Sequence, residues 1–198
     1  MRDRITGLLV AEAAQKTALQ RLAVELAAAT AFAALTAVGA RIQFHLPFTP
    51  VPVTGQVFCV LLAGCVLGSR LGFVSQVQYL TAGVAGLPVF ALGGGIGFLL
   101  GPTGGYLVGF PVAALVVGAI AQRGQGRVWS LAACLCGVTA IYLFGATWYG
   151  VWRSVTGAGG GITAVLHESV LPFIGVDAAK AVLAAVVAVP LRRRLSAI

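Results

Sequence analysis

Charged side chains are scarce in this sequence. Asp, Glu, Lys and Arg make up 9% of its 198 residues, against roughly 25% in a soluble globular domain. Hydrophobic residues make up 59%, and the mean hydropathy is +0.99. This shortage of charge excludes an ordinary soluble domain. It predicts an all-α integral membrane protein, with residues 1–198 forming a single membrane domain and no separate soluble catalytic domain.

The side chains that most catalytic sites need are also few. There are five Asp and Glu residues and two His residues, and no carboxylate pair, His/Cys cluster or Ser-His-acid set falls on one predicted face. The sequence contains no GxxxxGK[ST] phosphate loop. The four cysteines lie in apolar segments, at spacings that suit packing rather than disulfides. We therefore expect no enzymatic activity and no bound metal or nucleotide cofactor, so that any ATP hydrolysis must come from another subunit.

The apolar runs place the membrane spans. Six transmembrane helices are predicted at about 22–39, 56–67, 73–85, 104–122, 129–152 and 177–190. In this layout ten of the thirteen Lys and Arg residues fall on one side, two fall on the other, and Lys180 lies inside a span. The positive-inside rule then puts both termini, including an N-terminal arm over residues 1–20, on the cytoplasmic side of the cytoplasmic membrane. Because the basic residues form short clusters between spans, their excess indicates membrane topology rather than nucleic-acid binding.

Three structured loops are predicted on the outer face, and one of them is rich in glycine. The stretch Gly83–Phe110 lies inside a charge-free run of 52 residues and contains two prolines. Glycine lets the backbone approach a ligand closely, and aromatic rings supply apolar surface. We therefore expect an outward-facing pocket with a lid, in which this stretch contributes Phe90, Gly94, Gly104, Gly105 and Tyr106.

Two ionisable residues occur in the last span. Asp177 and Lys180 are three residues apart, so they share one face of a helix. Ionisable groups in a span are costly and commonly face an internal cavity. One interpretation is a helix cap with a structural ion pair, and the other is a polar ligand site. We favour the ligand site, since a carboxylate and an ammonium group together suit a small molecule that presents both N–H donors and a carbonyl or carboxylate.

Small side chains recur in the first span. Ala29, Ala33 and Ala37 are spaced at i, i+4 and i+8, which forms a groove where another helix can approach closely. The groove predicts either packing within this chain or docking of a partner subunit in the membrane. The spacing alone does not choose between them.

Four motifs carry a family resemblance. They are FTPVPVTGQVFCVLLAG (Phe48–Gly64), GLPVF (Gly86–Phe90), GPTGGYLVGF (Gly101–Phe110) and PFIGVDAAKAVLAA (Pro172–Ala185). In order and spacing the chain resembles the BioY family, the biotin-specific substrate-binding (S) component of energy-coupling factor (ECF) transporters. The resemblance implies a six-helix S-component fold that captures biotin from outside. It also implies partners: a transmembrane coupling subunit and two ABC-type ATPases.

The resemblance assigns roles to residues. It implies that Asp177 and Lys180 contact the ligand and that the alanine groove of the first span docks the coupling subunit. It also implies that the loops Phe48–Gln56 and Gly86–Tyr106 close over the vitamin, which adds Gln56 to the expected ligand contacts. Because a carboxylate only accepts hydrogen bonds and an ammonium group only donates them, Asp177 would accept a hydrogen bond from a ureido N–H of biotin. Lys180 would donate one to the carbonyl or the carboxylate of biotin.

Some questions stay open at this level. An S component for another small vitamin, or a membrane interaction protein that does not transport, would share much of this pattern. The sequence departs from some members of the family after GLPVF, where Ala91 and Leu92 stand in place of a polar residue. It matches no motif over Arg153–Leu171, which leaves the roles of His167 and Glu168 open. Association of several copies into a homo-oligomer is also left open.

Overall fold

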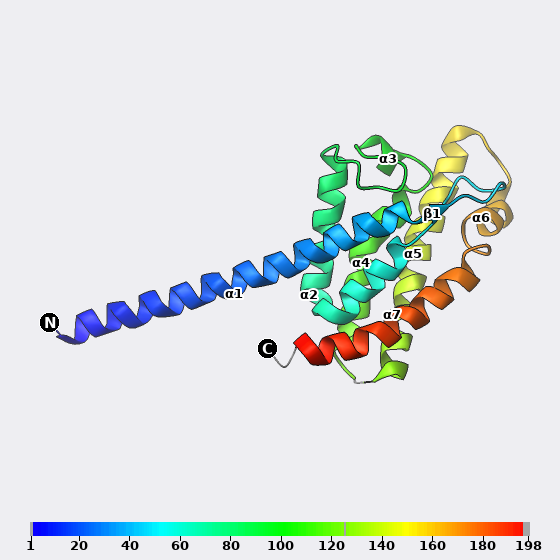
Figure 1. The fold of residues 1–198 in the computed structure, drawn as a ribbon. Helices are drawn as coiled ribbons and strands as arrows, with labels where there is room; N and C mark the ends of the chain where they lie inside the picture. Colours follow the sequence, from blue (N-terminus) through cyan, green and yellow to red (C-terminus); the bar gives the residue numbers. More distant parts are fainter. Residues whose placement is uncertain (1, 125, 196–198) are drawn as a thin grey trace.

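The fold is almost entirely helical (Figure 1). The structure is a computed structural model that describes residues 2–124 and 126–195, and the side chains of 17–124 and 126–194. Its elements are α1 (Arg2–Arg41), β1 (Gln43–Phe44), β2 (Val53–Thr54), α2 (Gln56–Val84), α3 (Gly97–Leu100), α4 (Gly104–Ala121), α5 (Arg127–Thr156), α6 (Gly161–Ser169) and α7 (Ile174–Leu195). In the described part of the chain, five helices are long and apolar enough to cross a membrane: α1 from Thr17, α2, α4, α5 and α7 to Arg194. A mostly helical, multi-pass membrane protein is therefore confirmed.

The second and third predicted spans, 56–67 and 73–85, are the two halves of α2. The helix is broken at Gly68, whose φ of 80° and ψ of −176° are not helical. A side chain at Gly68 would overlap Gln122, and Gln122 Oε1 accepts a hydrogen bond from Ser69 Oγ at 3.1 Å. Only glycine combines this backbone conformation with so close a neighbour. The break turns the second half of α2 sharply away from the first (Figure 1).

The first helix is longer than its predicted span. α1 continues without interruption from Arg2 to Arg41, so the predicted arm over residues 1–20 is the beginning of this helix. Its first half projects away from the other helices (Figure 1). The side chains of this arm up to residue 16 lie outside the described ones.

The connection predicted as an outer loop after the fifth span is partly helical. α5 continues to Thr156 and ends at Gly157, which has the left-handed φ of 72° typical of a helix terminus. The short helix α6 follows before α7 begins at Ile174. The loop interpretation of residues 153–176 is therefore wrong over α6. This connection has too few hydrophobic residues for a membrane span, but enough for the nine-residue surface helix α6.

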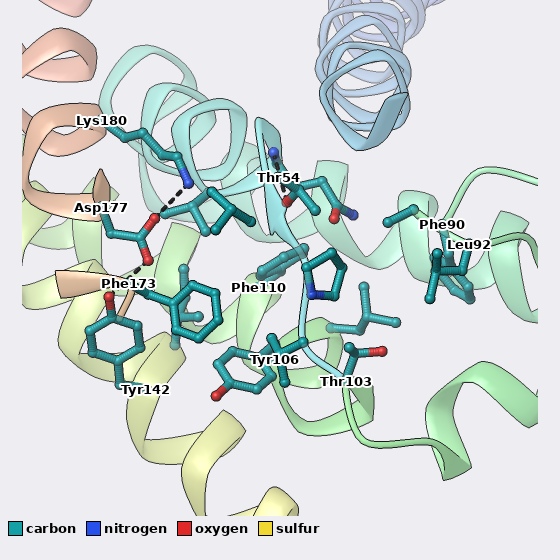
Figure 2. Close-up of a pocket in the computed structure, with 18 of the residues that line it drawn as sticks. Thr54, Phe90, Leu92, Thr103, Tyr106, Phe110, Tyr142, Phe173, Asp177 and Lys180 are labelled. Atoms are coloured by element: carbon teal, nitrogen blue, oxygen red, sulfur yellow. Dashed lines mark hydrogen bonds and ion pairs between the residues drawn. The ribbon is translucent and has the colours of Figure 1, made fainter. Parts of the chain in front are cut away.

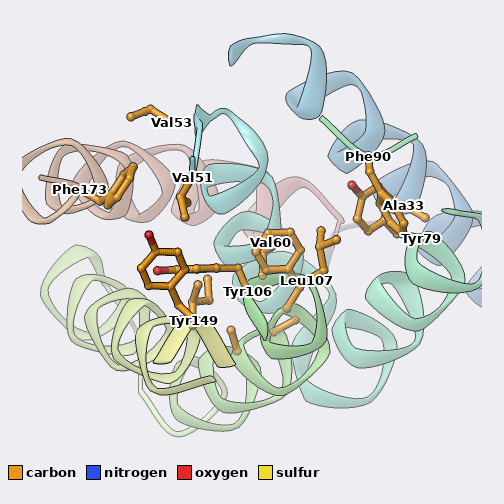
Figure 3. Close-up of a cluster of buried hydrophobic side chains, with 14 residues drawn as sticks. Ala33, Val51, Val53, Val60, Tyr79, Phe90, Tyr106, Leu107, Tyr149 and Phe173 are labelled. Atoms are coloured by element: carbon orange, nitrogen blue, oxygen red, sulfur yellow. The ribbon is translucent and has the colours of Figure 1, made fainter. Parts of the chain in front are cut away.

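The main hydrophobic core joins the helices with the loops at one end of the bundle. Its buried side chains come from α1, α2, α4, α5 and the segment before α7 (Figure 3). Tyr79 of α2 lies edge-on to Phe90, with ring centroids 5.5 Å apart. Val53 of β2 and Val51 of the connection between β1 and β2 belong to the same cluster. The irregular segments are thus part of the packed interior.

The alanine groove of α1 faces α2. Ala29 is fully buried, Ala33 is buried in the main core, and Ala37 packs against that core. Polar bonds hold the same two helices together: Gln76 Nε2 donates to Thr36 Oγ1 at 3.2 Å, and Thr30 Oγ1 contacts Gln78 Oε1 at 3.3 Å. In this arrangement the chain itself fills the groove, which is the packing alternative. Docking of a partner along these three alanines stays a prediction.

Candidate functional site

Asp177 and Lys180 form a close ion pair at the start of α7. Lys180 Nζ donates to Asp177 Oδ1 at 2.7 Å, and the i,i+3 spacing brings the two groups together as expected. The hydroxyl of Tyr142 on α5 donates to Asp177 Oδ2 at 2.8 Å. Asp177 is 4% exposed, so both carboxylate oxygens find donors where water is nearly excluded.

Tyr142 is a site residue that the sequence does not indicate. It lies 35 residues before Asp177, in the middle of an apolar helix, and no spacing rule links the two. Its contact depends on α5 packing against α7, which is a property of the tertiary fold. A tyrosine in the middle of a span is the one available signal, because a buried phenol needs a hydrogen-bond partner.

The ion pair lies on the wall of a cavity (Figure 2). Its empty volume is about 660 Å³ when the open mouth is counted. Its lining consists of Val51, Pro52, Val53, Thr54, Gln56, Val57, Phe90, Ala91, Leu92, Phe98, Thr103, Tyr106, Leu107, Phe110, Ile141, Tyr142, Phe173, Asp177 and Lys180. The lining is thus mainly aliphatic and aromatic, with one charged pair and a few neutral polar groups.

Five of the predicted ligand contacts come together at this cavity. Gln56 of α2, Phe90 of the loop after α2, Tyr106 of α4, and Asp177 and Lys180 of α7 all line it. The hydroxyl of Tyr106 already donates to the carbonyl oxygen of Ser169, which ties α4 to the end of α6. Tyr106 therefore offers the cavity its ring, while its hydroxyl stabilises the wall.

The three predicted glycines lie outside this lining. A side chain at Gly94 would overlap the carbonyl of Leu87, and one at Gly104 would overlap the carbonyl of Leu99. A side chain at Gly105 would overlap Trp148 of α5. These positions need glycine because the backbone packs closely there against other parts of the chain. The expected contact of their backbone with a ligand stays a prediction, and their geometry does not support it.

The segment 85–96, here called the covering loop, carries Phe90, Ala91 and Leu92 over the cavity (Figure 2). Phe90 and Gly93 pair through two backbone hydrogen bonds, of 2.8 and 3.2 Å, which make a tight turn. Gly93 has a φ of 148°, in the region that favours glycine. The turn presents its side chains to the cavity at a fixed position.

Three side chains from other elements hold the covering loop by its carbonyl groups. Arg41 at the end of α1 donates to the carbonyl of Pro88, and Gln43 of β1 donates to that of Ala91 at 2.7 Å. Tyr79 of α2 donates to the carbonyl of Val89 at 3.1 Å. Consecutive parts of the loop are thus anchored to α1, α2 and the hairpin, and Phe90 is held in place without a ligand.

The role of Glu168, which the sequence leaves open, is to help clamp α6 to α5. Glu168 accepts hydrogen bonds from Arg153 and, at 2.6 Å, from the hydroxyl of Tyr149. Arg153 also donates to the carbonyl of Gly159 at 2.8 Å, so it closes the turn before α6. Glu168 therefore fixes α6 against α5, upstream of the segment that carries Phe173 and Asp177. His167 is exposed and takes no part in the clamp.

Charge and shape together define what this site can hold. The described lining residues offer a carboxylate, an ammonium group and a neutral amide within apolar walls. Such a site suits a small molecule with an apolar body and a polar end that both donates and accepts hydrogen bonds. The fold and the site therefore define a multi-pass membrane protein with a partly open cavity suited to a small molecule.

The chain belongs to the BioY family, whose family model matches residues 12–197. It is 45% identical over 158 residues to a probable biotin transporter BioY from Pyrococcus horikoshii, covering 79% of this chain and 89% of that protein. It is 38% identical over 163 residues to the biotin transporter BioY from Thermotoga maritima, covering 82% and 92%. Its fold is similar to a crystal structure of the S-component for biotin from an ECF-type ABC transporter, with a TM-score of 0.78, 25% identity, and coverage of 88% and 93%.

Proposed function

We propose that this chain is the substrate-binding S component of an ECF-type transporter and captures biotin for uptake across the cytoplasmic membrane. The observation that carries the proposal is the Asp177–Lys180 pair in an otherwise apolar cavity of a BioY family member. Membership of the BioY family indicates which ligand to expect. The cavity supplies a site whose chemistry agrees with it.

Biotin matches the lining group by group. Its ureido ring has two N–H donors and one carbonyl, and its thioether ring is apolar. Asp177, which can only accept, takes a ureido N–H, and Lys180, which can only donate, bonds the carbonyl or the carboxylate. Phe90, Phe110 and Phe173 surround the apolar ring. Because Asp177 and Lys180 already bond each other, the ligand exchanges part of that pairing for its own hydrogen bonds.

The topology follows from the same proposal. The two halves of α2 count as separate membrane segments, which makes six with α1, α4, α5 and α7. Both termini lie on the cytoplasmic side, and the hairpin, the covering loop and α6 lie on the outer side. The distribution of Lys and Arg supports this orientation. Biotin then enters the cavity from the outer side.

Transport requires partners that this chain does not contain. We infer a transmembrane coupling subunit and two ABC-type ATPases, because ECF transporters use them and this sequence has no phosphate loop. The chain itself then needs no metal or nucleotide. Docking along Ala29, Ala33 and Ala37 requires α1 to shift away from α2, since α2 covers these residues.

Direct binding tests the proposal. The protein is purified in detergent from cells grown without biotin, and titration calorimetry measures its affinity for biotin. Competition of labelled biotin with other small vitamins identifies the preferred ligand. We expect saturable binding of one biotin per chain, with biotin recovered chemically unchanged. Preference for another vitamin would make the chain an S component of different specificity, and absence of any saturable binding would favour a membrane interaction protein.

A further inference from the structure

One side of the cavity contains a neutral hydrogen-bond chain that the Asp177–Lys180 pair does not touch. Gln56 lines the cavity and is 3% exposed, while Tyr79 lies behind it and is 1% exposed. Gln56 Nε2 donates to the Tyr79 hydroxyl, and that hydroxyl donates to the carbonyl of Val89 in the covering loop. The chain thus runs from the cavity wall through a buried phenol to the loop that covers the cavity.

The direction of these bonds follows from counting protons. A carbonyl oxygen only accepts, so the single proton of the Tyr79 hydroxyl goes to Val89. The phenol oxygen is then left with lone pairs alone. The Gln56 atom that faces it must be a donor, which is the amide nitrogen. A flipped amide would bring two acceptors together in a buried place, which is unfavourable because neither oxygen would then have a donor.

The oxygen of the Gln56 amide is left without such a bond. Among the described residues, none donates a hydrogen bond to Gln56 Oε1. This oxygen differs from Oε1 of Gln43 and of Gln76, which are also unpaired but fully enclosed by protein. Gln56 Oε1 is therefore an acceptor that the wall offers to the cavity.

We propose that Tyr79 is a positioning residue that fixes the Gln56 amide, so that Gln56 presents an acceptor and selects a ligand with a second N–H donor. The inference rests on the proposed function. A cyclic urea has two N–H groups, and Asp177 accounts for one of them. Gln56 Oε1 accounts for the other. Tyr79 touches no ligand and acts through Gln56.

Two isosteric ligands test this assignment. In the cyclic-carbamate analogues of biotin, one or the other ureido N–H is replaced by a ring oxygen, which turns a donor into an acceptor at nearly constant shape. Affinities for biotin and both analogues are measured for the parent protein, Tyr79→Phe and Gln56→Met. Thr81→Val is the matched control. It removes an exposed hydroxyl from the same half of α2, and this hydroxyl donates to the carbonyl of Val77 in its own helix.

For the parent protein, we expect each analogue to bind at least about tenfold more weakly than biotin. In Gln56→Met the penalty disappears for one analogue and remains for the other, which identifies the nitrogen that faces Gln56. In Tyr79→Phe the penalty for that same analogue shrinks to less than about threefold, because the freed amide can rotate and donate. Thr81→Val keeps both penalties.

The competing outcomes are distinct. If the parent binds biotin but Tyr79→Phe keeps the full penalty, Tyr79 does not fix the amide and this inference is wrong. If Gln56→Met leaves both penalties unchanged, Gln56 does not contact the ureido ring, and this result stands even where Tyr79→Phe fails to fold. If the parent binds no biotin, the proposed function fails, and the inference that rests on it fails as well.

Discussion

The two polar sides of the cavity are built in opposite ways. On one side, Asp177 and Lys180 lie on a single turn of α7 and carry opposite charges. On the other, Gln56 and Tyr79 are neutral, lie 23 residues apart, and meet because α2 is broken between them. The charged side depends on local spacing, and the neutral side depends on the tertiary fold. The difference shows that one ligand site can combine a part encoded in one helix turn with a part created only by a backbone break.

The largest effect on binding is expected when the carboxylate is removed from the charged side of the cavity. Asp177→Ala leaves Lys180 largely buried without its partner and takes away the only carboxylate among the described lining residues. Losing one member of a buried pair costs about 3–5 kcal/mol. We therefore expect the thermal unfolding temperature to drop. Biotin affinity should fall by at least about a hundredfold, because a ureido N–H loses its charged acceptor. Thermal unfolding in detergent and calorimetry measure the two effects.

A double variant separates stability from binding on that side. Asp177→Asn combined with Lys180→Met removes both charges, so we expect the unfolding temperature to recover while binding stays weak. Biotin affinity equal to that of the parent in the single variant Asp177→Asn would contradict the role of the charged acceptor.

The next test acts on the neutral side through packing alone. A side chain at Gly83 would overlap the ring of Phe90, which is buried on the cavity wall. Gly83→Ala should therefore displace Phe90 and lower biotin affinity by roughly thirtyfold, the equivalent of one lost aromatic contact. Alanine favours helix, so a loss of affinity cannot be attributed to a weaker α2. In the control Gly97→Ala the new methyl group meets no atom within 4 Å, and affinity should not change.

A smaller loss of affinity is expected from the one contact of the charged side that comes from another helix, the bond from Tyr142 to Asp177. Tyr142→Phe removes the hydroxyl that donates to Asp177 Oδ2 but leaves Lys180 in place. We expect biotin affinity to fall about tenfold, because the carboxylate loses one of its two protein donors. Tyr149→Phe removes a hydroxyl that bonds Glu168 instead, and its effect in the same titration should be smaller. Equal effects of the two variants would show that the Tyr142–Asp177 bond has no special importance for binding.

The smallest predicted change concerns the hold on the covering loop. Arg41→Met removes one of the three side chains that bond its carbonyl groups, at an exposed position. Biotin should dissociate about two- to threefold faster, as expected for one solvent-exposed hydrogen bond, and a dissociation measurement with labelled biotin would detect this. Arg127→Met removes an exposed arginine at the start of α5 and should leave the rate unchanged. No change in Arg41→Met would mean that the remaining anchors suffice.

What the sequence could predict follows the same division. The membrane class, the positions of most spans and the Asp177–Lys180 pair all rest on composition or local spacing, and the structure has each of them. The turn near Gly68 could be recognised from its glycines and arginine. That this turn brings Gln56 to Tyr79 depends on how the two halves of α2 pack.

The glycines show why the remaining site residues were out of reach. A glycine permits close approach of the backbone to any neighbour, whether a ligand or another helix. Sequence could therefore identify Gly94, Gly104 and Gly105 as unusual, yet it could not distinguish a cavity wall from the tight contacts with Leu87, Leu99 and Trp148. Tyr142 and the Arg153–Glu168 clamp were out of reach for a related reason, since their partners come from other helices or from a turn without a recognised motif.

The break at Gly68 also affects the surrounding lipid. The halves of α2 contain about 12 and 16 residues, which corresponds to lengths of about 18 and 24 Å. The hydrocarbon core of a bilayer is about 30 Å thick, so neither half matches it. In the proposed topology, where each half crosses the membrane separately, the bilayer beside α2 would have to thin locally, at a cost of a fraction of a kcal/mol per Å of mismatch. The protein should in consequence partition into thinner regions of a mixed bilayer, and it should unfold at a lower temperature in bilayers of long-chain lipids than in those of short-chain lipids.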